Sequence, residues 1–220
     1  MGRHDWYRRR TWTDADQTEF FARLKRSRGA FHKAQYLAIQ AGALCCAGKK
    51  QLASEAIKLL DMALTDYPTE SWQHASVFLT KANCLWRHKD HDAAIECMRR
   101  SLQAQRTRPN VMTTAWLEFG WYVVEAEMID LYDEALGVLA EFGPKYEDFE
   151  LPEQVYQKHT ILALILQHQG ELDAATQHAR EALSAAAATH SGYSRHPDIG
   201  LVKSTKNTLH RRLLALADES

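Results

Sequence analysis

Apolar residues recur along most of this chain at the three- and four-residue spacing of an amphipathic helix. The first such segment spans about residues 14–27, where Phe20 and Leu24 belong to an apolar stripe. Thr13 stands just before it and can cap the helix, while Asp16 favours the positive end of the helix dipole. The pattern therefore predicts one helix ahead of the main body of the chain.

Paired helices are predicted from about residue 32 onward. The first helices of the pairs are expected at 33–47, 72–88, 111–127 and 153–168, and their partners at 51–65, 91–105, 131–142 and 171–187. Prolines separate the pairs at positions 68, 109, 144 and 152. Each proline lacks a backbone donor and disfavours helix at the residue before it. The result is a series of helix–turn–helix units.

The predicted helices share a pattern of small and apolar residues. The second helices align on an alanine followed four residues later by an apolar residue: Ala56/Leu60, Ala94/Met98, Ala135/Leu139 and Ala175/Ala179. The first helices carry a small residue followed one turn later by an apolar one: Ala41/Leu44, Ala82/Leu85, Gly120/Val123 and Ala163/Leu166. A small residue is expected where the two helices of a pair cross closely, because a large side chain would push them apart.

Two stretches carry a family resemblance. Trp116-x-x-Phe119-Gly120-x-x-Val123 and the turn Gln169-Gly170-Glu171-Leu172-Asp173-Ala174-Ala175 resemble the tetratricopeptide repeat family. The resemblance covers residues 33–187 and implies an all-α solenoid of about four repeats with one concave face. Equivalent alanines lie about 38–41 residues apart, which also suits HEAT-like helical pairs as a structural alternative.

The two ends of the chain differ from the repeats. Residues 1–32 form a basic, aromatic-rich extension with its own helix, and residues 188–220 comprise a polar loop and a C-terminal capping helix. That last helix is expected over about 198–217. Its apolar side chains would cover the end of the repeat array: Ile199, Val202, Leu209, Leu213, Leu214 and Leu216.

Composition and cysteine content limit the classes of protein. The formal net charge is −1 and hydrophobic residues make up 45%, as in an ordinary globular domain. No apolar stretch approaches about twenty residues, so no transmembrane helix is expected. The cysteines lie within predicted helices at positions 45, 46, 84 and 97, and we expect free, mostly buried thiols. A reducing compartment, and hence a cytoplasmic location, follows as the expectation.

Acidic residues concentrate in the third predicted pair. Over residues 118–153 the only cationic side chain is Lys145, whereas the acidic ones are Glu118, Glu125, Glu127, Asp130, Asp133, Glu134, Glu141, Glu147, Asp148, Glu150 and Glu153. This stretch is either a set of solvated faces or a surface that attracts a basic partner. Both interpretations remain open at this point.

Two other features suggest different functions. The basic extension mixes Trp6, Tyr7 and Trp12 with arginines, which could serve single-stranded nucleic acid but is better explained by packing on the first repeat. His88 and His91 lie three residues apart and could begin a metal site, yet a solvated turn accounts for them. No catalytic or phosphate-binding motif is present, so neither an enzyme nor a cofactor is expected.

The resemblance implies a binding groove lined by the first helix of each pair. The groove positions carried over to this chain are Leu79, Asn83, Trp86, Arg87, Leu117, Trp121, Glu125, Thr160, Gln167 and His168. Asn83 matches part of the family's clamp for carboxylates, but Leu79 replaces the accompanying lysine. The groove therefore suits a helix or an extended peptide. The expected function is a protein–protein interaction module, namely an adaptor, a scaffold or an inhibitor such as an immunity protein that masks a basic toxin.

Overall fold

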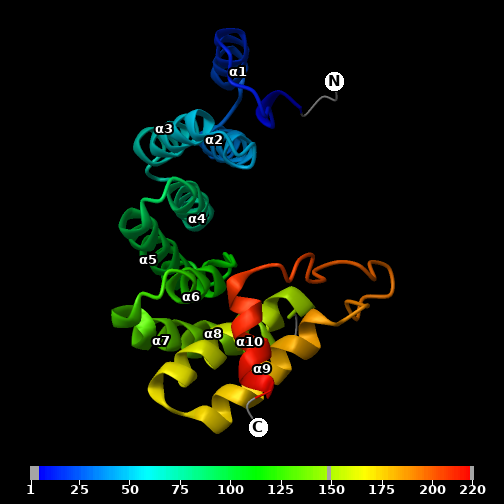
Figure 1. Ribbon diagram of the computed structural model, residues 1–220. Coiled ribbons are helices and arrows are strands. Elements are labelled where there is room, and N and C mark those ends of the chain that lie inside the picture. The colour runs from blue at the N-terminus through cyan, green and yellow to red at the C-terminus, as the bar shows by residue number, and fades with distance from the viewer. Residues whose placement is uncertain (1–4, 148–149, 219–220) are drawn as a thin grey trace. The chain divides into compact units, whose positions relative to one another are not determined.

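The protein is helical throughout the part of the chain that the structure describes. The computed structural model describes residues 5–147 and 150–218, which contain ten α-helices and no strand (Figure 1). The chain forms two compact units, Met1–Ala115 and Trp116–Ser220. The boundary between them falls inside the segment that the sequence predicts as a single repeat domain. Within the described residues, no helix is both long and apolar enough to cross a membrane.

The N-terminal helix begins where its sequence predicts. Helix α1 spans Asp14–Arg26, and the Thr13 hydroxyl accepts a hydrogen bond from the backbone N–H of Asp16. The Asp16 carboxylate in turn accepts from the backbone N–H of Thr13 at 2.9 Å. This reciprocal capping satisfies two backbone donors that the first turn would otherwise leave unpaired. The predicted helix at 14–27 is confirmed.

The aromatic residues ahead of α1 pack into the first unit. The short 3₁₀ turn η1 spans Asp5–Tyr7, and Trp6 contacts the rings of Phe20 and Tyr36. Arg9 forms ion pairs with Asp16 and Glu19. Trp6, Tyr7 and Trp12 therefore belong to the core of this unit, as the packing interpretation predicts.

The first unit contains two helix pairs. Its helices are α2 (Ala30–Cys45), α3 (Lys50–Asp66), α4 (Ser71–Arg87) and α5 (His91–Thr107). Helix α2 packs on α3, α4 packs on α5, and α4 also contacts both helices of the first pair. The two pairs are therefore stacked, as the predicted helix ranges lead one to expect.

The second unit contains the remaining helices. These are α6 (Ala115–Glu125), α7 (Tyr132–Phe142), α8 (Pro152–Gln169), α9 (Leu172–Ala186) and α10 (Thr208–Asp218), with 3₁₀ turns η2 (Ile129–Leu131) and η3 (Gly143–Lys145). Helix α8 packs along α9, and α10 lies against both of them. The Tyr156 hydroxyl on α8 lies 3.4 Å from Nδ1 of His210 on α10, so their polar groups also meet.

The aligned alanines occupy core positions. Ala56, Ala94, Ala135 and Ala175 are all fully buried, and so are the small residues Ala41, Ala82 and Ala163. Gly120 is also buried, and a Cβ atom there would lie 3.0 Å from Cδ1 of Ile161 on α8. A small residue is thus needed here. The three atoms nearest to such a Cβ all belong to Ile161 of α8, the first helix of the next pair, whereas the sequence pattern predicts the partner helix α7.

The C-terminal helix is shorter than predicted. The expected range of 198–217 is wrong, because the helix begins at Thr208, where the Asn207 side chain accepts a hydrogen bond from the His210 N–H at 2.7 Å. Gly200 adopts a left-handed φ of 63°, and its carbonyl accepts from the Glu153 N–H at 2.7 Å. Backbone in this conformation cannot continue a right-handed helix.

Only some of the apolar residues predicted to cover the end of the array are buried. Leu209, Leu213 and Leu216 are buried, as predicted. Ile199 and Leu214 are exposed, contrary to the prediction, and Val202 is half-buried. Leu214 points away from the face that Leu213 buries, since adjacent helical residues point in different directions.

Enlarging Gly120 tests the close approach of α6 to α8. Gly120→Leu should lower the free energy of unfolding by about 1–3 kcal/mol, because the buried Ile161 side chain leaves no room for it. A Cβ atom added at Gly137 on α7 would have nothing within 4 Å, so Gly137→Ala should stabilise by about 0.5–1 kcal/mol. Urea unfolding of both variants measures the difference. Equal effects would contradict the packing at Gly120.

Adjacent leucines on α10 test its structural role. Leu213 is fully buried, so Leu213→Ala should cost about 2–5 kcal/mol of unfolding free energy. Leu214 is 45% exposed, and Leu214→Ala should change stability by no more than about 0.5 kcal/mol. Thermal or urea denaturation provides the comparison. If both variants unfold like the wild type, α10 does not stabilise the second unit.

Candidate functional site

The predicted groove positions of the first unit lie together on α4. Leu79, Asn83 and Trp86 are half-buried and Arg87 is exposed. Their spacing of four, three and one residues keeps them on one side of the helix. The Trp86 ring stacks on the imidazole of His91, with ring centroids 4.1 Å apart. The tryptophan is thus held in place within its own unit while part of its surface stays open.

The groove prediction is wrong at two positions in the second unit. Leu117 and Thr160 are fully buried and cannot meet a partner. The Thr160 hydroxyl donates to the Tyr156 carbonyl at 2.6 Å, as befits a buried polar group. Leu117 lies one turn from Gly120, and Thr160 is next to Ile161, so both belong to the region where α6 and α8 approach closely.

The other groove positions of the second unit remain at least partly open. Glu125 and His168 are exposed, and Gln167 is half-buried. Trp121 is half-buried as well, with its ring centroid 6.0 Å from that of Tyr156. Each unit therefore has a partly accessible tryptophan on a first helix, at one of the predicted groove positions.

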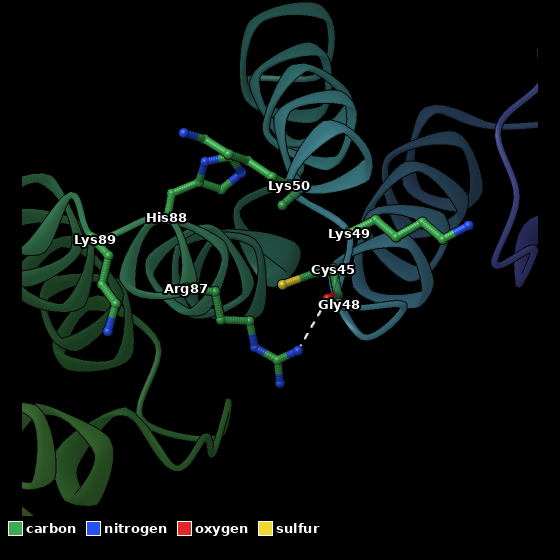
Figure 2. A pocket seen from close by; sticks show the side chains of 8 residues that line it. Cys45, Gly48, Lys49, Lys50, Arg87, His88 and Lys89 are labelled. Atoms are coloured by element: carbon green, nitrogen blue, oxygen red, sulfur yellow. Dashed lines mark hydrogen bonds between the residues drawn. The ribbon is translucent and has the colours of Figure 1, made fainter.

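A cavity in the first unit was not predicted. It has a volume of about 470 Å³, and its lining comprises Cys45, Gly48, Lys49, Lys50, Ala53, Arg87, His88 and Lys89. Figure 2 shows that these residues come from the end of α2, the turn into α3 and the start of that helix, and from the end of α4 and the turn that follows it. Lysine and arginine side chains dominate the polar lining, so the cavity favours an anion.

The cavity arises from the stacking of two helix pairs. Residues 48–50 lie at the turn between α2 and α3, and residues 87–89 at the corresponding turn between α4 and α5. Stacked pairs bring equivalent turns together, and both turns are basic. The sequence signal was therefore the repeated basic turn. Helix α3 also begins without a side-chain cap, so its first-turn N–H groups add positive potential.

Arg87 connects the two turns. Its Nη1 donates a hydrogen bond of 3.0 Å to the carbonyl oxygen of Cys45, drawn as the dashed line in Figure 2. The bond satisfies a carbonyl in the last turn of α2. It also holds the guanidinium group beside the cavity. Arg87 is therefore both a predicted groove residue and part of the cavity lining.

Two thiols adjoin the cavity. All four cysteines are free, as predicted; Cys46 is exposed, whereas Cys45, Cys84 and Cys97 are buried. A hydrogen bond from Cys84 and the charge of Arg87 together outweigh burial and lower the pKa of the Cys45 thiol. The same hydrogen bond, followed by burial, raises the pKa of Cys84 far above its usual value. Cys45 is therefore the member of the pair that ionises more readily.

His88 and His91, the predicted start of a metal site, have different neighbours. His88 lines the cavity, whereas His91 stacks against Trp86. Across residues 5–147 and 150–218, no group of three or more His, Cys, Asp or Glu side chains could hold a metal ion. The hypothesis of a metal-dependent enzyme therefore gains no support from the geometry.

The acidic stretch lies in the second unit and is largely exposed. Its exposed members are Glu125, Glu127, Asp130, Asp133, Glu141, Glu147 and Glu153. Glu127 pairs with Arg212 of α10 at 3.1 Å, and Glu150 pairs with Lys158 at 2.6 Å. Asp148 lies outside the described residues. The negative charge of this stretch therefore reaches the surface of the second unit.

A histidine pair joins α8 to α9. The Nδ1 atoms of His159 and His178 lie 3.0 Å apart, so one ring donates to the other when at least one is neutral. Burial, followed by the charges of His178 and Lys158, lowers the pKa of His159 to about 4, while Glu181 opposes this shift. Burial also lowers the pKa of His178.

The histidine pair should make the protein less stable in mild acid. His159 has a folded pKa of about 4 against an ordinary value of 6.5, so the unfolded chain binds the proton more readily. The free energy of unfolding should fall as pH drops from about 6.5 to about 4. We expect a loss of about 1–2 kcal/mol, less than the full shift implies because the ring is only half-buried. Urea unfolding across this pH range measures it.

A matched pair of variants isolates the histidine contribution. His159→Gln should flatten the pH dependence, whereas His196→Gln, at an exposed position in the loop before α10, should leave it unchanged. An identical acid slope in the wild type and His159→Gln would exclude the pair as its source.

Comparison with known proteins adds no relative to this chain. No family model matches it, and neither a curated protein nor a solved structure does.

Proposed function

We propose that this chain is a module that binds another protein through the first helices of its pairs. The observation that carries the proposal is that each unit has a tryptophan on a first helix whose ring is partly exposed and is contacted by a neighbouring ring. Trp86 stacks on His91, and Trp121 lies beside Tyr156. Both retain accessible surface.

Such tryptophans suit a binding surface for a physical reason. A large aromatic side chain supplies much of the contact area of a binding hot spot. A ring that is already held by neighbours loses little conformational freedom when a partner arrives. The residues beside Trp86 include apolar Leu79, polar Asn83 and cationic Arg87. This mixture fits an amphipathic helix or an extended peptide as the ligand.

Charge in the second unit favours a basic partner. Exposed Glu125, Asp130, Asp133 and Glu141 belong to one stretch of chain and would attract cationic side chains during the encounter. Within the proposed function, an inhibitor or immunity protein that masks a basic toxin is the narrower form. We further propose that the helix pairs are tetratricopeptide-like repeats and that the protein acts in the cytoplasm.

The nucleic-acid alternative is less well supported. It requires Trp6, Tyr7 and Trp12 as stacking platforms for bases. Tyr7 and Trp12 are buried, and Trp6 is enclosed by Tyr7, Phe20 and Tyr36. Exposed Arg8 and Arg10 remain available, but the aromatic part of that hypothesis is used for folding.

The tryptophans provide the first test. Partners are captured from a lysate of the source organism and identified by mass spectrometry, and the purified partner is then titrated against variants. Trp86→Ala and Trp121→Ala should each weaken binding by about 2 kcal/mol, or roughly thirtyfold. Trp72→Ala is the matched control, since Trp72 is exposed at the start of α4 and stacks with Arg108. If only Trp72→Ala weakens binding, the surface lies elsewhere.

Glu125 provides the second test. Glu125→Lys should slow association with a basic partner by severalfold at low salt and reduce the salt dependence of the rate, with little change in dissociation. Glu171→Lys is the control, because Glu171 is exposed at the turn before α9 and outside the acidic stretch. Stopped-flow kinetics at two ionic strengths decide the matter. Equal association rates for the wild type and Glu125→Lys would show that the acidic stretch is only a solvated face.

A further inference from the structure

The cavity of the first unit places a thiol at the edge of a cationic site. Cys45 lines the cavity although only 4% of the residue is exposed, and Cys84 on α4 is completely buried. Cys46, the next residue along the chain, is exposed and does not line the cavity. Accessibility alone therefore predicts that a reagent modifies Cys46 first, whereas the surroundings of the thiols favour Cys45.

The surroundings of Cys45 promote both ionisation and the approach of an anion. The Cys84 thiol donates to the Cys45 sulfur, and the Arg87 charge is nearby, so the pKa of Cys45 is lowered. Lys49, Lys50 and Lys89 lie around the same cavity. A thiolate is the reactive form of cysteine, and cationic neighbours concentrate anionic reagents at the site.

We propose that Cys45 is a site of thiol–disulfide exchange with anionic low-molecular-weight disulfides, and that Cys84 is its resolving thiol. The cavity of about 470 Å³ has room for a small peptide-like reagent, whose carboxylates the lysines and Arg87 would hold. This inference does not rest on the proposed partner-binding function.

The exchange takes place in two balanced steps. The Cys45 thiolate attacks one sulfur of the disulfide reagent, so that a mixed disulfide forms and one thiolate leaves. The Cys84 thiol then gives its proton to the thiolate that left in the first step, and the Cys84 sulfur attacks the Cys45 sulfur. The bond between Cys45 and the reagent breaks, and the second half of the reagent leaves as a thiolate that takes a proton from water. The protein loses two electrons in forming the Cys45–Cys84 disulfide, and the reagent gains them as two thiols.

Geometry fixes the order in which the two thiols react. Cys45 lines the cavity, whereas Cys84 does not line it and is completely buried. An incoming disulfide therefore meets Cys45 first. The hydrogen bond with Cys45, followed by burial, raises the pKa of Cys84, so that thiol is protonated before the first step.

The test uses the reduced full-length chain with two reagents of opposite charge. Glutathione disulfide is anionic and cystamine is cationic, and intact mass with peptide mapping follows modification at each cysteine over time. For each cysteine, the charge preference is the rate of modification by glutathione disulfide divided by the rate by cystamine. This ratio should be about tenfold higher at Cys45 than at Cys46, and the difference should shrink at high salt. Cys46 serves as an internal control in the same molecule.

Two variants report on the cavity itself. Arg87→Gln should lower the charge preference at Cys45 by severalfold, whereas Arg100→Gln should not change it. Arg100 is exposed on α5 and pairs with Glu96, away from the cavity lining. Both variants are made in a Cys46→Ser background so that a single reactive site is followed.

The modified forms of the protein that are found decide whether the proposal holds. A mixed disulfide at Cys45, or a Cys45–Cys84 linkage, that forms with the stated preference for glutathione disulfide supports the inference. In Cys84→Ser the reaction should stop at the mixed disulfide, and the linkage found in the wild type gives the same information if that variant fails to fold. Modification confined to Cys46, or the same charge preference at both cysteines, would overturn the proposal.

Discussion

The packing of this protein depends on how closely its helices can approach one another. Two α-helices pack at about 8–10 Å between axes, and the side chains at the crossing decide where in that range they lie. Fully buried alanines stand at the aligned positions of the second helices, and Gly120 lets α6 meet Ile161 on α8. Because these residues are small, larger neighbours such as Leu60 and Met98 can fill the space between helices and bury their apolar surface.

The same stacking also creates the chemistry of the first unit. A basic turn follows α2 and another follows α4, and neither turn is unusual alone. When α4 packs against both α2 and α3, the two turns and the Cys45–Cys84 pair come together. Arg87 completes the site by donating to the Cys45 carbonyl. The cationic cavity beside Cys45 is thus a consequence of how the two helix pairs stack and of the basic residues in their turns.

Opposite charges are concentrated in the two units. The first unit carries the cationic cavity, and the second carries the exposed acidic stretch with Glu125 and Asp133. A net charge of −1 conceals this separation. Each unit also presents a partly open tryptophan on a first helix, so the proposed binding function combines similar aromatic contacts with different electrostatics. The two features would act on different parts of a binding event, because charge mainly affects association and buried aromatic area mainly affects dissociation.

Local sequence was enough to locate the paired helices, the first helix and many of their buried positions. Periodicity located the paired helices, the Thr13–Asp16 capping residues marked the start of α1, and the alanine pattern identified core positions. These features depend on residues within a few turns of one another. The features that the sequence did not predict depend on packing between segments that are far apart in the chain. That packing buried Leu117 and Thr160 beside the crossing of α6 and α8, and the turn at Gly200 with the cap at Asn207 delayed the last helix until Thr208. It also brought Cys45 to Arg87, because contacts between residues 42 positions apart arise only when one helix pair packs on the next.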